Sequence, residues 1–148
     1  MEKKYEILEN DTIQVNGHKL LRIRALRNFW TVEKGQLGGY VESEENLSHN
    51  GNAWVFGDAR VFGKIMLRGQ ARVGHTKDFQ AFGGLGREFF NLTAYRTIGG
   101  IELSTNEFQG SIEEFRKWSK KTYKNYPKLK RSFELILEEI KVWFDLND

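Results

Sequence analysis

The chain contains no cysteine, a single proline and no apolar run approaching the roughly 20 residues of a membrane-spanning helix. The absence of cysteine excludes disulfide bonds, thiolate zinc sites and a cysteine nucleophile. The first residues lead into no apolar signal segment, so we expect a cytoplasmic protein in a reducing compartment. With 148 residues, the chain has the length of one domain and can bury a core of its own.

A six-residue repeat occupies the middle of the chain. Small or aliphatic residues recur at every sixth position, namely Val41, Leu47, Ala53, Ala59, Ile65 and Ala71. A second apolar column follows two residues later, at Val55, Val61, Leu67 and Val73, and the corner glycines are Gly51, Gly57, Gly63 and Gly69. Two inward side chains spaced by two make a short strand, and glycine lets the backbone bend after it. Three units make one coil, so the repeat predicts a hexapeptide-type β-helix of about two coils, expected to be left-handed.

The first coil departs from the pattern. Its second column begins with Ser43 and His49, where the later units have aliphatic residues. An imidazole is bulky and needs a hydrogen-bond partner when it is buried. We therefore expect the first coil to be irregular around His49.

The regions on either side of the repeat indicate a hairpin, a small sheet and two helices. Residues 5–26 predict an N-terminal β-hairpin, because Asn16-Gly17 suits a tight turn between strands. Aromatic-rich segments predict antiparallel strands at 79–82, 89–96 and 101–108. Ser111 and Glu114 fit a capping box, and a second helix is expected after Pro127. The predicted fold is mainly β with α, with residues 1–76 and 77–148 packed as one unit.

Coils of three hexads stack residues eighteen apart, which would bring Trp54 next to Arg72. One interpretation is a ligand-binding platform on the outside of the coil. Its candidate residues are Trp54, Arg60, Arg68, Arg72 and His75. The alternative is that these side chains are covered by the C-terminal helices or by another subunit.

A second candidate site is a run of basic residues near the C-terminus. The net charge is only +3, but no acidic residue occurs between positions 116 and 131. The candidate residues are Lys117, Lys120, Lys121, Lys124 and Lys128, with Arg116, Lys130 and Arg131 beside them. Such a cluster could contact nucleic acid or an acidic protein surface, and the alternative is an ordinary solvated helix face.

Catalytic and metal-binding patterns are weak in this sequence. The hexad pattern resembles that of hexapeptide-repeat acyltransferases, in which a histidine acts as general base. The candidate histidines are His18, His49 and His75, and the sequence identifies no orienting partner for any of them. Acidic residues and histidines do not cluster at metal-ligand spacing. We therefore expect no catalytic residues, no metal and no cofactor.

Three segments in a fixed order give a resemblance to phage and prophage proteins of uncertain function. They are L-x-R-I-x-A-L at residues 20–26, L-G-G-[FY]-V-E-S-E-x-N-L-S at 37–48 and G-D-A-x-V-[FY]-G at 57–63. The resemblance covers about a third of the chain and implies a phage or prophage origin and a hexapeptide-like β-helix. It supplies no activity that can be assigned to individual residues.

The functional hypothesis is a phage-encoded, non-enzymatic binding protein in the host cytoplasm. The resemblance suggests an antagonist of host defence, comparable to an anti-CRISPR protein, that blocks a nucleic-acid-binding effector or sequesters a nucleotide signal. A first alternative is a structural or assembly protein, because open coil ends invite association into a homo-oligomer. A second alternative is a relative of the hexapeptide-repeat acyltransferases. The expected partner is a host protein or a nucleotide, with no membrane contact.

Overall fold

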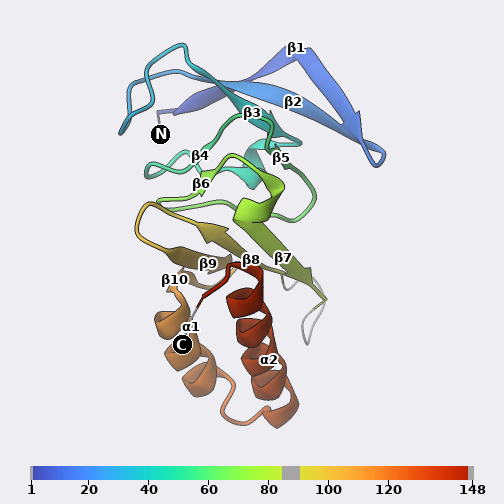
Figure 1. Ribbon diagram of the computed structural model, residues 1–148, viewed down its shortest axis with the longest axis vertical. Coiled ribbons are helices and arrows are strands. Elements are labelled where there is room, and N and C mark those ends of the chain that lie inside the picture. The colour runs from blue at the N-terminus through green and yellow to red at the C-terminus, as the bar shows by residue number, and fades with distance from the viewer. Residues whose placement is uncertain (1, 85–90, 147–148) are drawn as a thin grey trace.

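The computed structural model describes residues 2–84 and 91–146. It begins with an antiparallel hairpin of β1 (Tyr5–Val15) and β2 (His18–Ala25) (Figure 1). The turn residues Asn16 and Gly17 both have positive φ, at 49° and 85°, as a two-residue hairpin turn requires. The predicted hairpin is therefore confirmed.

The repeat region contains short strands that pair in parallel. The strands are β3 (Leu37–Val41), β4 (Trp54–Val55), β5 (Arg60–Val61) and β6 (Arg72–Val73). β3 pairs with β5, which extends the hairpin into a four-stranded sheet, and β4 pairs with β6. The pairing of Trp54 with Arg72 has the predicted spacing of eighteen residues. The 3-10 helix η1 (Glu44–Asn46) interrupts the first part of the repeat, where the sequence predicts irregularity.

The two apolar columns of the repeat point inward. Every member of both columns is buried except Ile65, which packs against the same core while partly exposed. The four corner glycines have φ between 56° and 70°, a region that side chains with a Cβ atom disfavour. The hexad pattern thus predicts correctly which side chains form the core and where the backbone bends.

A second sheet is antiparallel and follows the 3-10 helix η2 (Thr76–Asp78). It contains β7 (Phe79–Gly83), β8 (Asn91–Arg96), β9 (Ile101–Thr105) and β10 (Gln109–Ser111). Of the strand predicted at 89–96, the first two residues lie outside the described residues. The strand predicted at 101–108 is too long: it ends at Thr105, where the chain turns into β10, which the sequence analysis did not predict.

Two helices complete the chain. α1 (Ile112–Thr122) begins with the predicted capping box, in which Ser111 and Glu114 each satisfy a backbone donor of the other. α2 (Pro127–Trp143) begins at the proline. Backbone N–H groups in the first turn of a helix have no intrahelical acceptor, so a residue without an N–H is tolerated there. The fold is therefore mixed β with α, comprising several sheets and two C-terminal helices.

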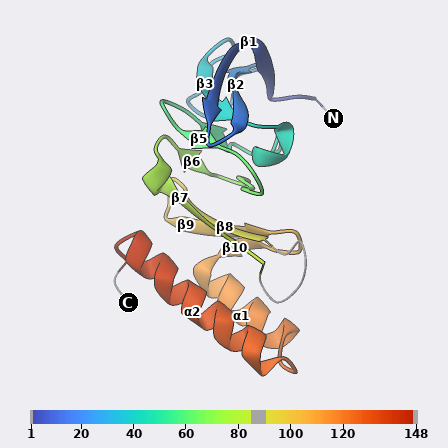
Figure 2. The ribbon, with the colours of Figure 1, turned by 90° about the vertical axis from the view of Figure 1, so that its right-hand side faces the viewer.

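The second sheet lies between the repeat region and the helices (Figure 2). Tyr95 of β8 belongs to the hydrophobic cluster of the repeat, while Leu92 and Ala94 belong to the cluster formed with α1 and α2. Alternate side chains of one strand thus enter different cores. None of the described helices has the length and apolar composition needed to cross a membrane.

Substitutions at two corner glycines distinguish the cost of a positive φ angle from the cost of a steric clash between neighbouring corners. A Cβ atom at Gly51 would lie 2.9 Å from the carbonyl oxygen of Gly69, whereas a Cβ atom at Gly63 would meet no atom within 4 Å. Both glycines have similar positive φ values. We expect Gly63→Ala to lower the free energy of unfolding by about 1–2 kcal/mol, and Gly51→Ala to lower it further. Urea denaturation measures both, and equal losses would show that the corners do not constrain each other.

Candidate functional site

The structure brings together two of the five predicted platform residues. Trp54 and Arg72 lie side by side on the paired strands β4 and β6. Arg60 is exposed on β5, opposite Tyr40. Arg68 donates a hydrogen bond of 2.9 Å to the Thr105 carbonyl at the end of β9.

The fifth residue, His75, caps η2, where its side chain accepts a hydrogen bond from the Lys77 backbone N–H. Arg60, Arg68 and His75 therefore have surroundings that differ from those of Trp54 and Arg72. Among the five predicted platform residues, the pairing of β4 with β6 places Trp54 and Arg72 in a common site.

Trp54 is buried beneath the segment that joins β2 to β3. The edge of the Phe29 ring meets its indole at a centroid distance of 5.3 Å. Its indole Nε1 is buried and has no hydrogen-bond acceptor. The alternative expectation of a covered Trp54 is thus met, but Phe29 and Gly38 of β3 lie against its indole rather than the C-terminal helices.

Arg72 lies against a second tryptophan of the same covering segment. Its guanidinium carbon is 3.9 Å from the centroid of the Trp30 ring, a close cation–π contact. Nε and Nη2 of Arg72 are buried and find no acceptor. Burial also lowers the pKa of Arg72 below its usual value. The positive charge is therefore held in place by an aromatic surface and not by a carboxylate.

Lys4 brings another cationic group to the same region. Its side chain is fully buried, and Nζ donates to the Ala53 carbonyl at 2.5 Å and lies 3.5 Å from the Gly51 carbonyl. Burial, followed by the charges of Arg27 and Arg72, lowers the pKa of Lys4 from 10.5 to about 7. Lys4 satisfies carbonyl groups of the repeat, but its ammonium faces like charges.

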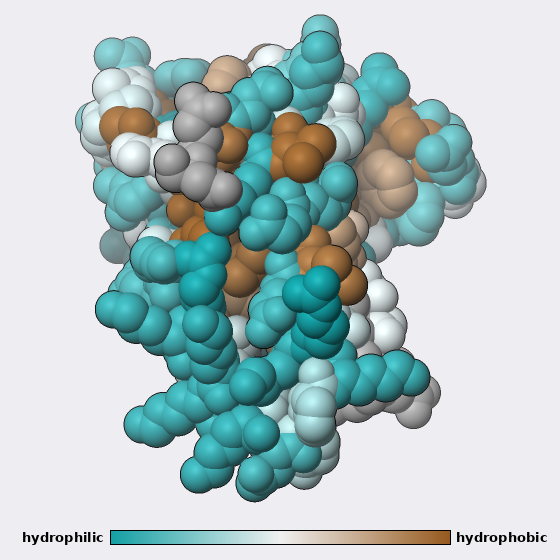
Figure 3. All heavy atoms as spheres, turned by 60° about the horizontal axis from the view of Figure 1, so that its bottom comes forward, coloured by the Kyte–Doolittle hydropathy of each residue, from teal (hydrophilic) through white to brown (hydrophobic). Residues whose placement is uncertain are grey.

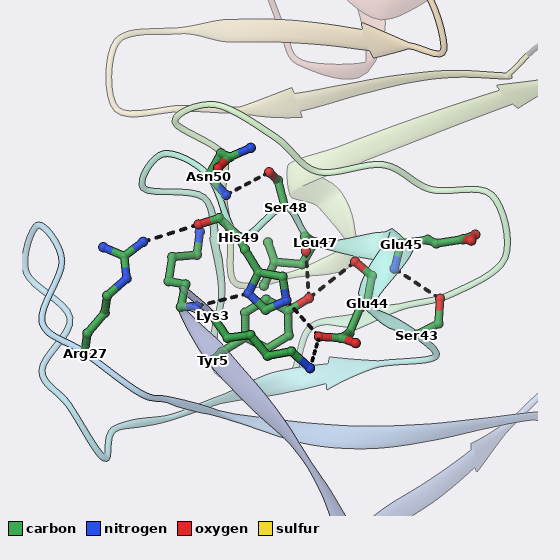
Figure 4. A network of polar contacts seen from close by, with 11 residues as sticks. Lys3, Tyr5, Arg27, Ser43, Glu44, Glu45, Leu47, Ser48, His49 and Asn50 are labelled. Atoms are coloured by element: carbon green, nitrogen blue, oxygen red, sulfur yellow. Dashed lines mark hydrogen bonds and ion pairs between the residues drawn. The ribbon is translucent and has the colours of Figure 1, made fainter. Parts of the chain in front are cut away.

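Arg27 is the third cationic residue. Its Nη2 donates to the His49 carbonyl at 3.3 Å, while its Nε is buried without an acceptor (Figure 4). The His49 ring stacks on Tyr5 at 4.2 Å and has a partner on each nitrogen. Nδ1 accepts from the Lys4 backbone N–H at 3.0 Å, so Nε2 carries the hydrogen toward Glu44, 2.8 Å away. His49 is partly buried, and the expectation that its imidazole needs a hydrogen-bond partner is confirmed.

We call Lys4, Arg27, Arg72, Trp30 and Trp54 the cationic cluster. Four buried donor atoms of this cluster have no acceptor in the part of the chain that the structure describes: Arg27 Nε, Arg72 Nε, Arg72 Nη2 and Trp54 Nε1. Within residues 2–84 and 91–146, no carboxylate forms an ion pair with its three cationic residues. Unpaired buried donors and uncompensated positive charge cost free energy, and an anion would reduce both costs. The chemistry that this arrangement offers is anion binding beside an aromatic surface.

The predicted basic run lies at the other end of the molecule, where α1 and α2 meet (Figure 1). Arg116 and Arg131 form ion pairs with Glu113 and Glu134 on their own helices. The remaining candidates are exposed and form no ion pair with any described residue, namely Lys117, Lys120, Lys121, Lys124 and Lys128. Tyr126, at the tip between the helices, is 62% exposed. Long hydrophilic side chains project from this end (Figure 3).

Two of the three histidines have carboxylate partners that the sequence did not reveal. His18 Nδ1 lies 2.8 Å from Glu42 Oε2, and His49 Nε2 lies 2.8 Å from Glu44 Oε1. The Glu42 carboxylate also accepts from the Gly63 backbone N–H. These bonds hold the pKa values of Glu42 and Glu44 below the usual range. In the described residues, no three acidic or histidine side chains are grouped so that they could hold a metal ion.

Sequence reasoning identified Trp54 and Arg72 but missed Lys4, Arg27 and Trp30. The spacing of eighteen residues was the signal for the first pair. The other three lie outside the repeat and reach it through tertiary contacts, for which the sequence carries no periodic signal. No protein-family model matches the chain, and a search of curated proteins finds no significant match.

The lowered pKa of Lys4 predicts a specific pH dependence of stability. Between about pH 7 and pH 10.5 the unfolded chain holds a proton on Lys4 that the folded protein has released. The free energy of unfolding contributed by this residue therefore rises with pH across that window. We expect the unfolding free energy of the wild type minus that of Lys4→Met to increase from pH 7 to pH 9.5. Urea titrations at several pH values measure this difference. Parallel pH profiles for the two proteins would contradict the burial of the Lys4 ammonium.

Proposed function

We propose that this chain is a non-enzymatic binding protein that captures a small anionic ligand at the cationic cluster. The observation that carries the proposal is the set of four buried donors without acceptors beside three cationic side chains. Arg27 and Arg72 are partly exposed as residues, but the four unpaired donor atoms are covered by protein atoms, so an anion reaches them once the covering side chains move aside. Hydrogen bonds to charged groups contribute more than neutral ones, which favours an anion over a neutral ligand.

The biological role that we propose is antagonism of a host defence system by a phage-encoded protein in the host cytoplasm. Its support is the resemblance of residues 20–73 to phage and prophage proteins, together with a site suited to sequestering an anion. In this proposal the parallel pairs of the repeat belong to about two coils of a β-helix. That scaffold fixes Arg72 beside Trp54 and would keep the site rigid before the ligand arrives.

A second candidate function uses the basic end of the helices. Five exposed lysines that form no ion pair with any described residue, near the exposed Tyr126 in sequence, are suited to a negatively charged protein surface. In this version the protein blocks a nucleic-acid-binding effector by occupying a surface of that effector. Binding would weaken as salt is raised, because exposed charges are screened.

Two further alternatives make different predictions. A structural protein would form a defined homo-oligomer whose stability does not depend on anions. An acyltransferase would use a histidine as general base, and His18 with Glu42 is the partly exposed pair available for that role. Native mass spectrometry of the protein purified gently from bacterial cells reports oligomeric state, retained ligand and retained partner together.

Anion capture predicts stabilisation by a simple anion that depends on Arg72. Pyrophosphate at about ten times its Kd should raise Tm by roughly 3 °C in the wild type. Arg60→Gln removes the same charge from an outward position on β5 and should leave the shift unchanged. Arg72→Gln should abolish the shift. Thermal denaturation with and without pyrophosphate measures all three, and equal shifts in the two variants would remove the cationic cluster from the proposal.

The effector-blocking function predicts that the location of positive charge matters, and not its amount. Reversal of Lys120, Lys121, Lys124 and Lys128 to glutamate should release a bound host protein in native mass spectrometry. A matched variant reverses four other exposed lysines, Lys19, Lys34, Lys64 and Lys77, and should retain the complex. Retention of the host protein by both variants would exclude the basic end as its binding surface.

A further inference from the structure

Trp30 has a backbone conformation that is unfavourable for a bulky side chain. Phe29 and Val32 exchange backbone hydrogen bonds of 2.8 and 3.0 Å, so Trp30 and Thr31 form the two central residues of a tight turn. The φ angle of Trp30 is +48°, in the left-handed region. Glycine and asparagine are the residues that usually occupy such positions. Strained residues of this kind cluster at sites of function.

The side chain that this turn presents is an exposed aromatic surface. Trp30 is 55% exposed, whereas Phe29 and Trp54 beside it are buried. The guanidinium of Arg72 lies over the Trp30 ring, with its central carbon 3.9 Å from the ring centroid. Hydrophobic burial therefore does not explain why a tryptophan occupies this turn. A flat ligand group could stack on the exposed part of the indole at little cost in side-chain entropy.

Two arginines of the cationic cluster are suited to a phosphate, and one of them, Arg72, contacts Trp30. Arg72 Nε and Nη2 and Arg27 Nε are donors without acceptors among the described residues, and a phosphate reaches them once the side chains that cover them move aside. Arginine donors match the geometry of phosphate oxygens and can bind two of them at once. A simple inorganic anion would use these donors but would leave the Trp30 surface uncovered. A ligand with an aromatic ring and a phosphate would use both features.

Resting on the proposed function, we propose that the ligand is a nucleotide whose base stacks on Trp30 and whose phosphate is bound by Arg72 and Arg27. Stacking of a base on an aromatic side chain tolerates different bases, so this site selects a nucleotide over an inorganic anion more strongly than it selects one base. Trp30 is then a binding residue, and the strained turn serves to hold the indole at the surface beside Arg72.

The experiment compares four kinds of probe by isothermal titration calorimetry at fixed, low salt. The probes are the four nucleoside 5′-monophosphates, ribose 5-phosphate, adenosine and inorganic phosphate. We expect at least one nucleotide to bind about tenfold or more tightly than ribose 5-phosphate, which has the same phosphate but no base. Adenosine, which lacks the phosphate, should bind more weakly than the nucleotide.

Variants at Trp30 separate stacking from phosphate binding. Trp30→Gly relieves the strained φ angle and should remain folded by circular dichroism. It should bind the nucleotide no more tightly than ribose 5-phosphate, with its affinity for ribose 5-phosphate little changed. Trp30→Asn, which also tolerates this backbone conformation, provides a second test should the glycine variant be poorly folded. Trp143→Ala removes an exposed tryptophan of α2 and should leave nucleotide affinity unchanged.

The possible failures are distinguishable. Equal affinity of the wild type for nucleotides and ribose 5-phosphate would overturn the stacking inference and leave anion capture standing. Full nucleotide affinity in Trp30→Gly would overturn it as well. Absence of binding by every phosphate-bearing probe at millimolar concentration would overturn the proposed function together with this inference.

Discussion

The parallel backbone pairing between residues 40–56 and 59–73 is the constraint on which the rest of the structure depends. Hydrogen bonds such as Trp54 N–H to Ala71 O and Phe56 N–H to Val73 O align the two segments. The alignment needs small or aliphatic side chains inside and glycines with positive φ at the corners. Within the paired segment, the Gly51 and Ala53 carbonyl groups accept hydrogen bonds from the Lys4 ammonium.

The same pairing gives the candidate site its unpaired positive charge and its buried donors without acceptors. Parallel alignment places Trp54 and Arg72 next to each other, with Phe29 and Gly38 against Trp54 and Trp30 against Arg72. Covering removes water from the Arg72 donors without supplying protein acceptors. Lys4 and Arg27 add positive charge to the region, and the lowered pKa of Lys4 is the consequence. A protein under no functional constraint would gain stability from a carboxylate here.

Local and periodic features of the fold could be predicted from the sequence. The period of six identified the inward columns, Asn16-Gly17 identified the hairpin turn, and Ser111 with Glu114 identified the start of α1. The division of residues 101–111 into two strands could not be predicted, because the turn at Thr105–Phe108 lacks glycine and proline. Lys4, Arg27 and Trp30 could not be assigned to the site for a related reason. Their contacts join residues far apart in the chain, and a lysine before a strand ordinarily indicates solvent exposure.

The most direct test of the account follows the unpaired donors themselves by NMR during a titration with pyrophosphate. The account predicts saturable shifts of the Arg72 Nε–H and Arg27 Nε–H signals, because these groups gain an acceptor. Signals that remain fixed while the lysine side chains of the basic end respond would contradict it. That result would move the anion-binding surface from the repeat region to the helices.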